Sequence, residues 1–264
     1  MRTRTATGSR TAALLLLLLL PGAAARGESS HEWYPLSLGD ERAYRIHWDH
    51  ALQPAGEAAV RKFSMGWSQE RVVAQGPFSV RAGRPIFRMD ELTEEQPLDG
   101  SPTERQDSRY YVASGKGGVF FYQHDPGAAA EGVWPRFRDT PVLLLPGSPQ
   151  VGQQWRAGTL LQGKIEVDLR GEIVGFEDVE IPSGRHPGCL HVRLTGRPRG
   201  WVEGQDGPGR IVGGVFEQEL WLAREIGAVK AVIRTDLDVQ SSSGEKVRVS
   251  TVSKSRLERA PPAS

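Results

Sequence analysis

The distribution of hydrophobic and polar residues along the chain predicts a protein built mainly from β-strands. In several stretches every second residue is apolar and the residues between are polar, a period of two that is typical of a strand with one buried face. The clearest cases are Tyr44, Ile46 and Trp48; Ile165, Val167 and Leu169; and Leu190, Val192 and Leu194. Further strands are expected at 108–113, 119–123, 171–176, 215–223, 228–235 and 246–252.

The connections between these strands are short, which favours antiparallel pairing. The 31 Gly and 18 Pro residues leave little room for long helices. The stretch 220–234 is interpreted as a hairpin: Leu220 and Leu222 share one strand face, Glu225 to Gly227 form the turn, and Val229 begins the returning apolar face. The segment 89–108 is polar and rich in turn formers, so it is expected to be a loop.

The first 25 residues have the pattern of a secretory signal peptide. Three arginines precede the apolar run 12–20, and the small residues of "PGAAA" follow it, so cleavage is expected after Ala25. The protein is therefore expected to be exported, periplasmic or secreted. No Cys stands directly after the run, so no lipid anchor is expected, and the run is too short for a transmembrane helix, so none is expected in the mature chain. Residues 26–257 are expected to form one β-rich domain, alternatively divided into similar halves at 31–140 and 141–257, and 258–264 a disordered tail.

Net charge gives no support for nucleic-acid binding. The whole chain has 33 Lys and Arg against 32 Asp and Glu, and removal of Arg2, Arg4 and Arg10 with the signal peptide leaves 30 against 32, a net charge of −2. Proteins that bind nucleic acid carry concentrated positive charge.

Several blocks resemble an exported bacterial family, the domain of unknown function 3108-like family. The blocks are "YPLSLGDERAYRI" from Tyr34, "YYVASGKGGVFFY" from Tyr110, "VEIPSGRHPGCLHVRL" from Val179 and "LWLAREIGAVKAVI" from Leu220. The chain departs from the family pattern at Ser183, His186, Pro187, Glu225 and Ile226. The resemblance implies a strongly curved antiparallel sheet or open barrel in the cell envelope, and it supplies no catalytic residue.

Few side chains form a pattern with recognisable chemistry. His186, Cys189 and His191 in "HPGCLH" are potential zinc or copper ligands, but a fourth protein ligand is not evident. His47 and Asp49 in "HWDH" share one strand face and His50 points to the other. The carboxylate pairs Glu166 with Asp168, and Glu217 with Glu219, are typical of solvated strands. No nucleophile-elbow, H-E-x-x-H or P-loop motif is present, so no catalytic residue and no cofactor is assigned.

The seven tryptophans are a better indication of binding than the polar clusters. Trp221 alternates with the apolar residues Leu220 and Leu222, so it is expected on the outer, more polar face of its strand, where it is a candidate binding residue. The sequence therefore predicts a non-enzymatic envelope protein that binds an apolar ligand or a protein partner. The alternatives are a metal-dependent enzyme that uses His186, Cys189 and His191, and a purely structural envelope component.

Overall fold

The structure, a computed structural model, describes residues 30–123, 134–137, 140–204 and 207–259. It contains one short 3-10 helix, η1 (Ser30–Glu32), and twelve strands. The strands are β1 (Glu41–Pro54), β2 (Val60–Ser79), β3 (Arg84–Pro97), β4 (Glu104–Gly115), β5 (Gly118–Tyr122), β6 (Val142–Pro146), β7 (Gln154–Gln162), β8 (Ile165–Ile181), β9 (Gly184–Gly204), β10 (Gly207–Ala223), β11 (Gly227–Gln240) and β12 (Lys246–Arg259). The predicted signal peptide, 1–25, lies outside the described residues, as does 260–264. Strand β12 includes 258 and 259, the first two residues of the predicted tail.

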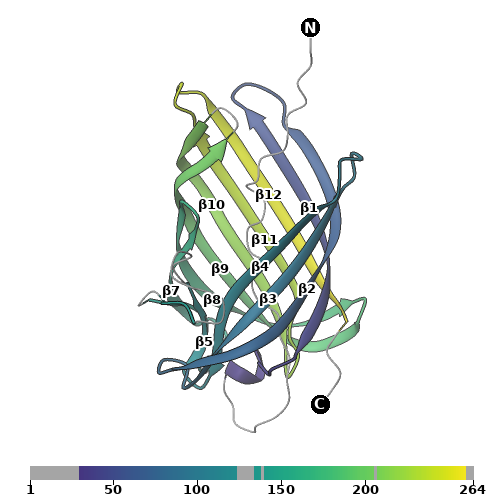
Figure 1. Cartoon of the computed structure of the whole chain (residues 1–264), viewed down its shortest axis with the longest axis vertical. Helices are drawn as coiled ribbons and strands as arrows, with labels where there is room; N and C mark the ends of the chain where they lie inside the picture. Colours follow the sequence, from purple (N-terminus) through teal and green to yellow (C-terminus); the bar gives the residue numbers. More distant parts are fainter. Residues whose placement is uncertain (1–29, 124–133, 138–139, 205–206, 260–264) are drawn as a thin grey trace.

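All twelve strands belong to one antiparallel sheet that curves into a nearly closed barrel (Figure 1). Its order is β6-β5-β4-β3-β2-β1-β12-β11-β10-β9-β8-β7, so the first and last strands of the chain pair with each other. The predicted curved antiparallel sheet or open barrel is confirmed. The suggested halves, 31–140 and 141–257, share this one sheet, and a similarity between them stays a prediction.

The barrel has one unsealed seam, between the edge strands β6 and β7, where side chains replace the backbone ladder. The Gln123 side chain donates from Nε2 to the carbonyl of Thr159 (2.8 Å) and accepts from the amide of Leu161 (2.5 Å). The indole Nε1 of Trp155 donates to the carbonyl of Leu143 (2.8 Å). Gln123 thus satisfies backbone groups at the edge of β7 much as a neighbouring strand would.

The predicted hairpin at 220–234 is confirmed. Strand β10 pairs with β11, and the turn between them places Glu225 at φ 59° and Gly227 at φ 96°. Gly tolerates this left-handed backbone, whereas a β-branched residue would be strained there. The predicted loop at 89–108 is wrong, because β3 and β4 occupy most of it and only residues 98–103 connect them.

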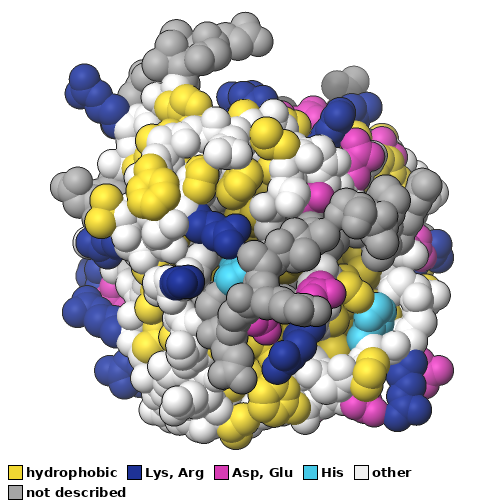
Figure 2. Space-filling model, turned by 90° about the horizontal axis from the view of Figure 1, so that it is seen from below, with side chains coloured by type: hydrophobic (Ala, Val, Ile, Leu, Met, Phe, Trp, Pro, Cys, Tyr) yellow, Lys and Arg dark blue, Asp and Glu magenta, His cyan; other side chains and the backbone are white. Residues whose placement is uncertain are grey.

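One end of the barrel, called the floor end here, is crossed by the chain that leads into β1. Ser30 donates from its amide to the carbonyl of Gly147 and from its hydroxyl to the carbonyl of Gly115. On the other side, the carbonyl of Glu32 accepts from the amide of Glu225 in the β10–β11 turn. Trp33 and Tyr34 then pack into the core. Figure 2 shows this end, with basic and acidic side chains around its rim.

The main core fills the barrel above the floor with apolar side chains. On β8 to β11, the residues Ile173, Val192, Leu220 and Ala231 form one inward-facing row across neighbouring strands, and all four are buried. Alternation of this kind is what the sequence pattern predicted for these strands. Within the described residues, no helix has the length and apolar character needed to cross a membrane.

Candidate functional site

The three predicted metal ligands, His186, Cys189 and His191, do not converge on a common point. His186 is in hydrogen-bond contact through Nε2 with the hydroxyl of Ser183 (3.2 Å), and burial lowers its pKa. The thiol of Cys189 donates to the carbonyl of His186 (3.3 Å), and burial raises its pKa to about 11, which disfavours the thiolate that binds metals. His191 interacts with Glu177 and Trp221 instead. In the described parts of the chain, no group of three His, Cys, Asp or Glu side chains is placed to hold a metal ion.

Trp221 lies on the outer face of β10, but its ring has neighbours on both sides. The His191 ring stacks on it at 4.4 Å between centroids, and Nζ of Lys230 lies 3.7 Å from its centroid. Glu177 joins the group by accepting from Trp221 Nε1 and contacting His191 Nδ1, each at 2.8 Å. The hydrogen bond from Trp221 is the main reason that the pKa of Glu177 is lowered. With 5% of its surface exposed, Trp221 offers little area to a ligand in this arrangement.

The carboxylate pairs on the outer face are occupied by arginines. Arg199 contacts Glu166 (2.9 Å) and Asp168 (2.7 Å) together. Arg193 lies 3.5 Å from Glu217 and 3.3 Å from Glu219. The pairs of Arg199 are exposed and those of Arg193 are half-buried, and both are typical of the ion-paired outer face of a sheet rather than of a catalytic acid and base.

A polar interior face, which sequence reasoning missed, is the most unusual feature of the barrel. Three successive rows of side chains cross β1 to β4 and point inward, and together they are called the polar wall. From the floor end upward, the rows are Arg42, Glu70, Glu91 and Ser108; then Tyr44, Ser68, Thr93 and Gln106; then Ile46, Gly66, Glu95 and Glu104. Polar groups are costly to bury, so a wall of this kind needs an explanation.

The lowest row of the polar wall contains a buried ion pair. Nη1 of Arg42 lies 3.7 Å from Glu70 Oε2, and neither side chain is exposed. Nη1 also lies 3.5 Å from the hydroxyl of Tyr44. Burial lowers the pKa of Arg42, and it raises the pKa of Tyr44 and of Tyr34, which lies under this row. The positive charge of Arg42 is thus compensated by its ion pair with Glu70.

Glu91 is a second buried carboxyl group, next to Glu70 in the same row. The hydroxyls of Ser68 (2.7 Å) and Thr93 (3.2 Å) both donate to its Oε1. Only 7% of the residue is exposed, and no basic side chain among the described residues forms an ion pair with it. Burial raises its pKa to about 7, against the smaller opposing effect of the two hydroxyls.

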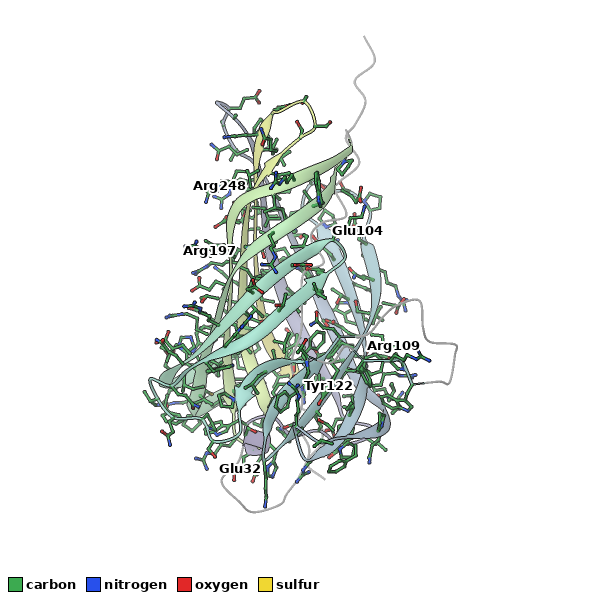
Figure 3. The ribbon with its side chains drawn as sticks, turned by 90° about the vertical axis from the view of Figure 1, so that its left-hand side faces the viewer. Glu32, Glu104, Arg109, Tyr122, Arg197 and Arg248 are labelled. Atoms are coloured by element: carbon green, nitrogen blue, oxygen red, sulfur yellow. The ribbon has the colours of Figure 1, made fainter. Side chains whose placement is uncertain are left out.

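The polar wall becomes more exposed away from the floor end. Glu95 accepts from the hydroxyl of Ser64 and lies 3.2 Å from Nε2 of His50, whose other ring nitrogen is 3.4 Å from the hydroxyl of Thr251. The side chain of Glu95 is 22% exposed, and Glu104 beside it is exposed. Figure 3 shows Glu32 at the lower end of the molecule and Glu104 in its upper half. The gradient indicates that solvent reaches the interior from the end opposite the floor.

A depression on the outer face of β2 to β4 is less suitable as a site. Its volume is about 670 Å³, and its lining includes Glu41, Arg71, Asp90 and Arg109. These charges are already paired with one another, Arg71 with Glu41 at 3.1 Å and Arg109 with Asp90 at 3.4 Å. The depression is therefore an ordinary ion-paired surface.

Comparisons with known proteins add little to this description. No protein-family model matches the chain, and no curated protein matches it. Among solved structures, the chain is similar to a protein from Parabacteroides distasonis whose crystal structure is described as that of a "putative lipoprotein". The two are 12% identical, 86% of this chain and 97% of the other are covered, and the TM-score is 0.40. A likeness this weak assigns neither a family nor a function.

Proposed function

We propose that this protein is a non-enzymatic binding protein of the cell envelope, and that it receives a small ligand against the polar wall. The signal-peptide pattern of residues 1–25 supports export, and the sequence blocks similar to the domain of unknown function 3108-like family support the same class of protein. The polar wall carries the binding part of the proposal.

The physical argument starts from the cost of the polar wall. A barrel needs only apolar side chains inside to be stable, and the row of Ile173, Val192, Leu220 and Ala231 meets that need on β8 to β11. Glu91, in contrast, bears a raised pKa because burial penalises its charge. A ligand that contacts this wall would give such a destabilising arrangement a purpose, as polar groups in binding sites commonly have.

The proposal changes the expected ligand from apolar to polar. The two alternatives are less well supported: a metal enzyme lacks a converging ligand set at His186, Cys189 and His191, and a structural component has no need of the polar wall. A protein partner bound through Trp221 would have to displace Lys230 or His191 from its ring.

The test is native mass spectrometry of the full chain, purified from an expressing bacterium without refolding. We expect a small molecule to co-purify with the wild-type protein and to add its mass to the protein's. It should be absent from Ser108→Trp, whose indole would fill the interior beside Glu91. Asp107→Trp places the same ring on the exposed outer face of the same strand and should retain the molecule. Thr93→Tyr, on the neighbouring strand, is the second blocking variant in case Ser108→Trp does not fold. A wild-type protein that carries nothing, or equal retention in the blocked and control variants, would support the structural alternative.

A further inference from the structure

The charges of the polar wall do not balance, and this imbalance says something about the ligand. Four carboxyl groups point inward from its three rows, Glu70, Glu91, Glu95 and Glu104. The same rows contain one guanidinium, that of Arg42, and its closest carboxylate is Glu70. His50 lies beside Glu95. Glu91 is left as a buried carboxyl group with no cation assigned to it in the described parts of the chain.

The carboxylates also face one another directly across the sheet. Glu70 is opposite Glu91, and Glu95 is opposite Glu104. Like charges at directly opposite positions repel, so each pair destabilises the strands that carry it. A positive charge placed between the rows would relieve this repulsion.

Several buried atoms at the bottom of the wall have unused hydrogen-bonding capacity. Both hydrogen bonds to the Glu91 carboxyl end on Oε1, and no described residue donates to Oε2. The hydroxyl of Tyr34 makes no hydrogen bond within the described residues, although the residue is only 2% exposed, and it can accept one from an amine. Nε and Nη2 of Arg42 also have no partner there, but both are donors and call for an acceptor instead. Buried polar groups are normally satisfied, so this region is arranged to receive further polar atoms.

We infer that the ligand of the polar wall presents a protonated amine, which donates to Oε2 of Glu91 and is held between the facing carboxylates. This inference rests on the proposed function, since it names the chemistry of the same ligand. An organic amine fits better than a metal ion, because the described residues offer no group of three potential metal ligands.

The probe is hexylamine, compared with hexan-1-ol and hexanoate, which have the same chain and a neutral or negative head. Isothermal titration calorimetry of the full chain at pH 8 and low salt should show binding of hexylamine alone. Glu91→Gln keeps the shape and removes the charge, and it should weaken hexylamine at least 10-fold. Glu41→Gln, an exposed carboxylate on the outer face that pairs with Arg71, is the control and should leave the affinity unchanged.

The outcomes separate this inference from the proposed function. Absence of hexylamine binding, equal binding of hexan-1-ol, or no effect of Glu91→Gln would overturn the amine, while loss of the co-purified molecule in Ser108→Trp would still support a ligand in the interior. Hexylamine binding that survives Ser108→Trp would place the amine elsewhere and overturn the inference as well. Binding that depends on both Glu91 and an open interior would support it.

Discussion

The two sides of the barrel interior follow opposite rules. The row of Ile173, Val192, Leu220 and Ala231 on β8 to β11, called the apolar wall here with its inward-facing neighbours, is buried and mostly hydrophobic, with Gln218 and Thr235 as buried polar residues among them. The polar wall on β1 to β4 has the same antiparallel geometry and the same alternation of inward and outward residues, but carboxyl, hydroxyl and amide groups occupy its inward positions.

This difference separates stability from function within one sheet. Burial of apolar surface contributes about 25 cal/mol per Å², so the apolar wall supplies a large part of the free energy that folds the barrel. The polar wall contributes less and contains groups that oppose folding, Glu91 above all. Variants of the two walls should therefore shift stability in opposite directions.

The largest effect is expected from Phe216→Ala on the apolar wall. Phe216 is fully buried and lies opposite Gly196, which has no side chain to fill the space left by the ring. Removal of a buried Phe typically costs about 3 to 5 kcal/mol, and a site that cannot collapse lies at the upper end. Urea unfolding monitored by circular dichroism measures the change. Val215→Ala, on the outer face of the same strand and 54% exposed, should change stability by less than about 0.5 kcal/mol.

Glu91→Gln should instead stabilise the protein, and only at higher pH. The pKa of Glu91 is raised by burial from 4.5 to about 7, which corresponds to about 3 kcal/mol. Between these values the folded protein keeps a proton that the unfolded chain releases, so wild-type stability falls as the pH rises through this window. Glu70 lies opposite the same carboxyl group and adds to its cost when charged, although Arg42 lies close to Glu70. Burial raises the pKa of Tyr44 and Tyr110 well above the usual range, so these neighbours stay neutral in this window.

Urea midpoints of wild type and Glu91→Gln at pH 5 and pH 8 test this sign. The two proteins should be similar at pH 5, and the variant should be more stable by up to about 3 kcal/mol at pH 8. Glu41→Gln, on the exposed outer face, should show no such difference between the two pH values. A Glu91→Gln variant that is less stable than wild type at pH 8 would mean that the charged carboxylate is well solvated. The cost of burying Glu91 would then no longer support a binding role for the polar wall.

The same contrast explains how far the sequence could be interpreted. Alternation identified β1, β8, β9, β10 and β11 because their inward residues are apolar, and the hairpin turn at Gly227 followed from the same pattern. Strand β3 was missed, and 89–108 was predicted as a loop, because Glu91, Thr93 and Glu95 are about as polar as their outward neighbours, and alternation is invisible when both faces of a strand are polar. Strand β2 was missed although it does alternate, with its apolar residues Phe63, Met65 and Trp67 on the exposed outer face.

The site was missed for the same reason, and no local motif could have replaced the pattern. Arg42, Glu70 and Glu91 lie on three different strands, and only the pairing register brings them into one row. The predicted site residues had been chosen for the chemistry of their side chains. Two of them, His191 and Trp221, do lie together, but as a stacked pair on the outer face. A useful signal would have been that Glu91, Thr93 and Glu95 continue, at every second position, the apolar face that ends at Met89. All three are polar residues at positions where an inward face is expected.

The smallest effect concerns the seam between the edge strands β6 and β7. On the opposite side the two halves of the sheet are joined by the long β1–β12 ladder, whereas at the seam Gln123 supplies two hydrogen bonds to the edge of β7. Gln123→Ala should cost about 1 to 2 kcal/mol, because each lost bond contributes about 0.5 to 1.5 kcal/mol. The sharper measurement is hydrogen exchange of the Leu161 amide, which should become faster as its acceptor is removed. Gln240→Ala, which removes a side-chain bond to Gly244 in the β11–β12 turn, should leave that amide unchanged. Unchanged exchange at Leu161 in Gln123→Ala would show that the two halves of the barrel are held at the seam by packing, with Trp155 and its bond to Leu143 as the next residue to test.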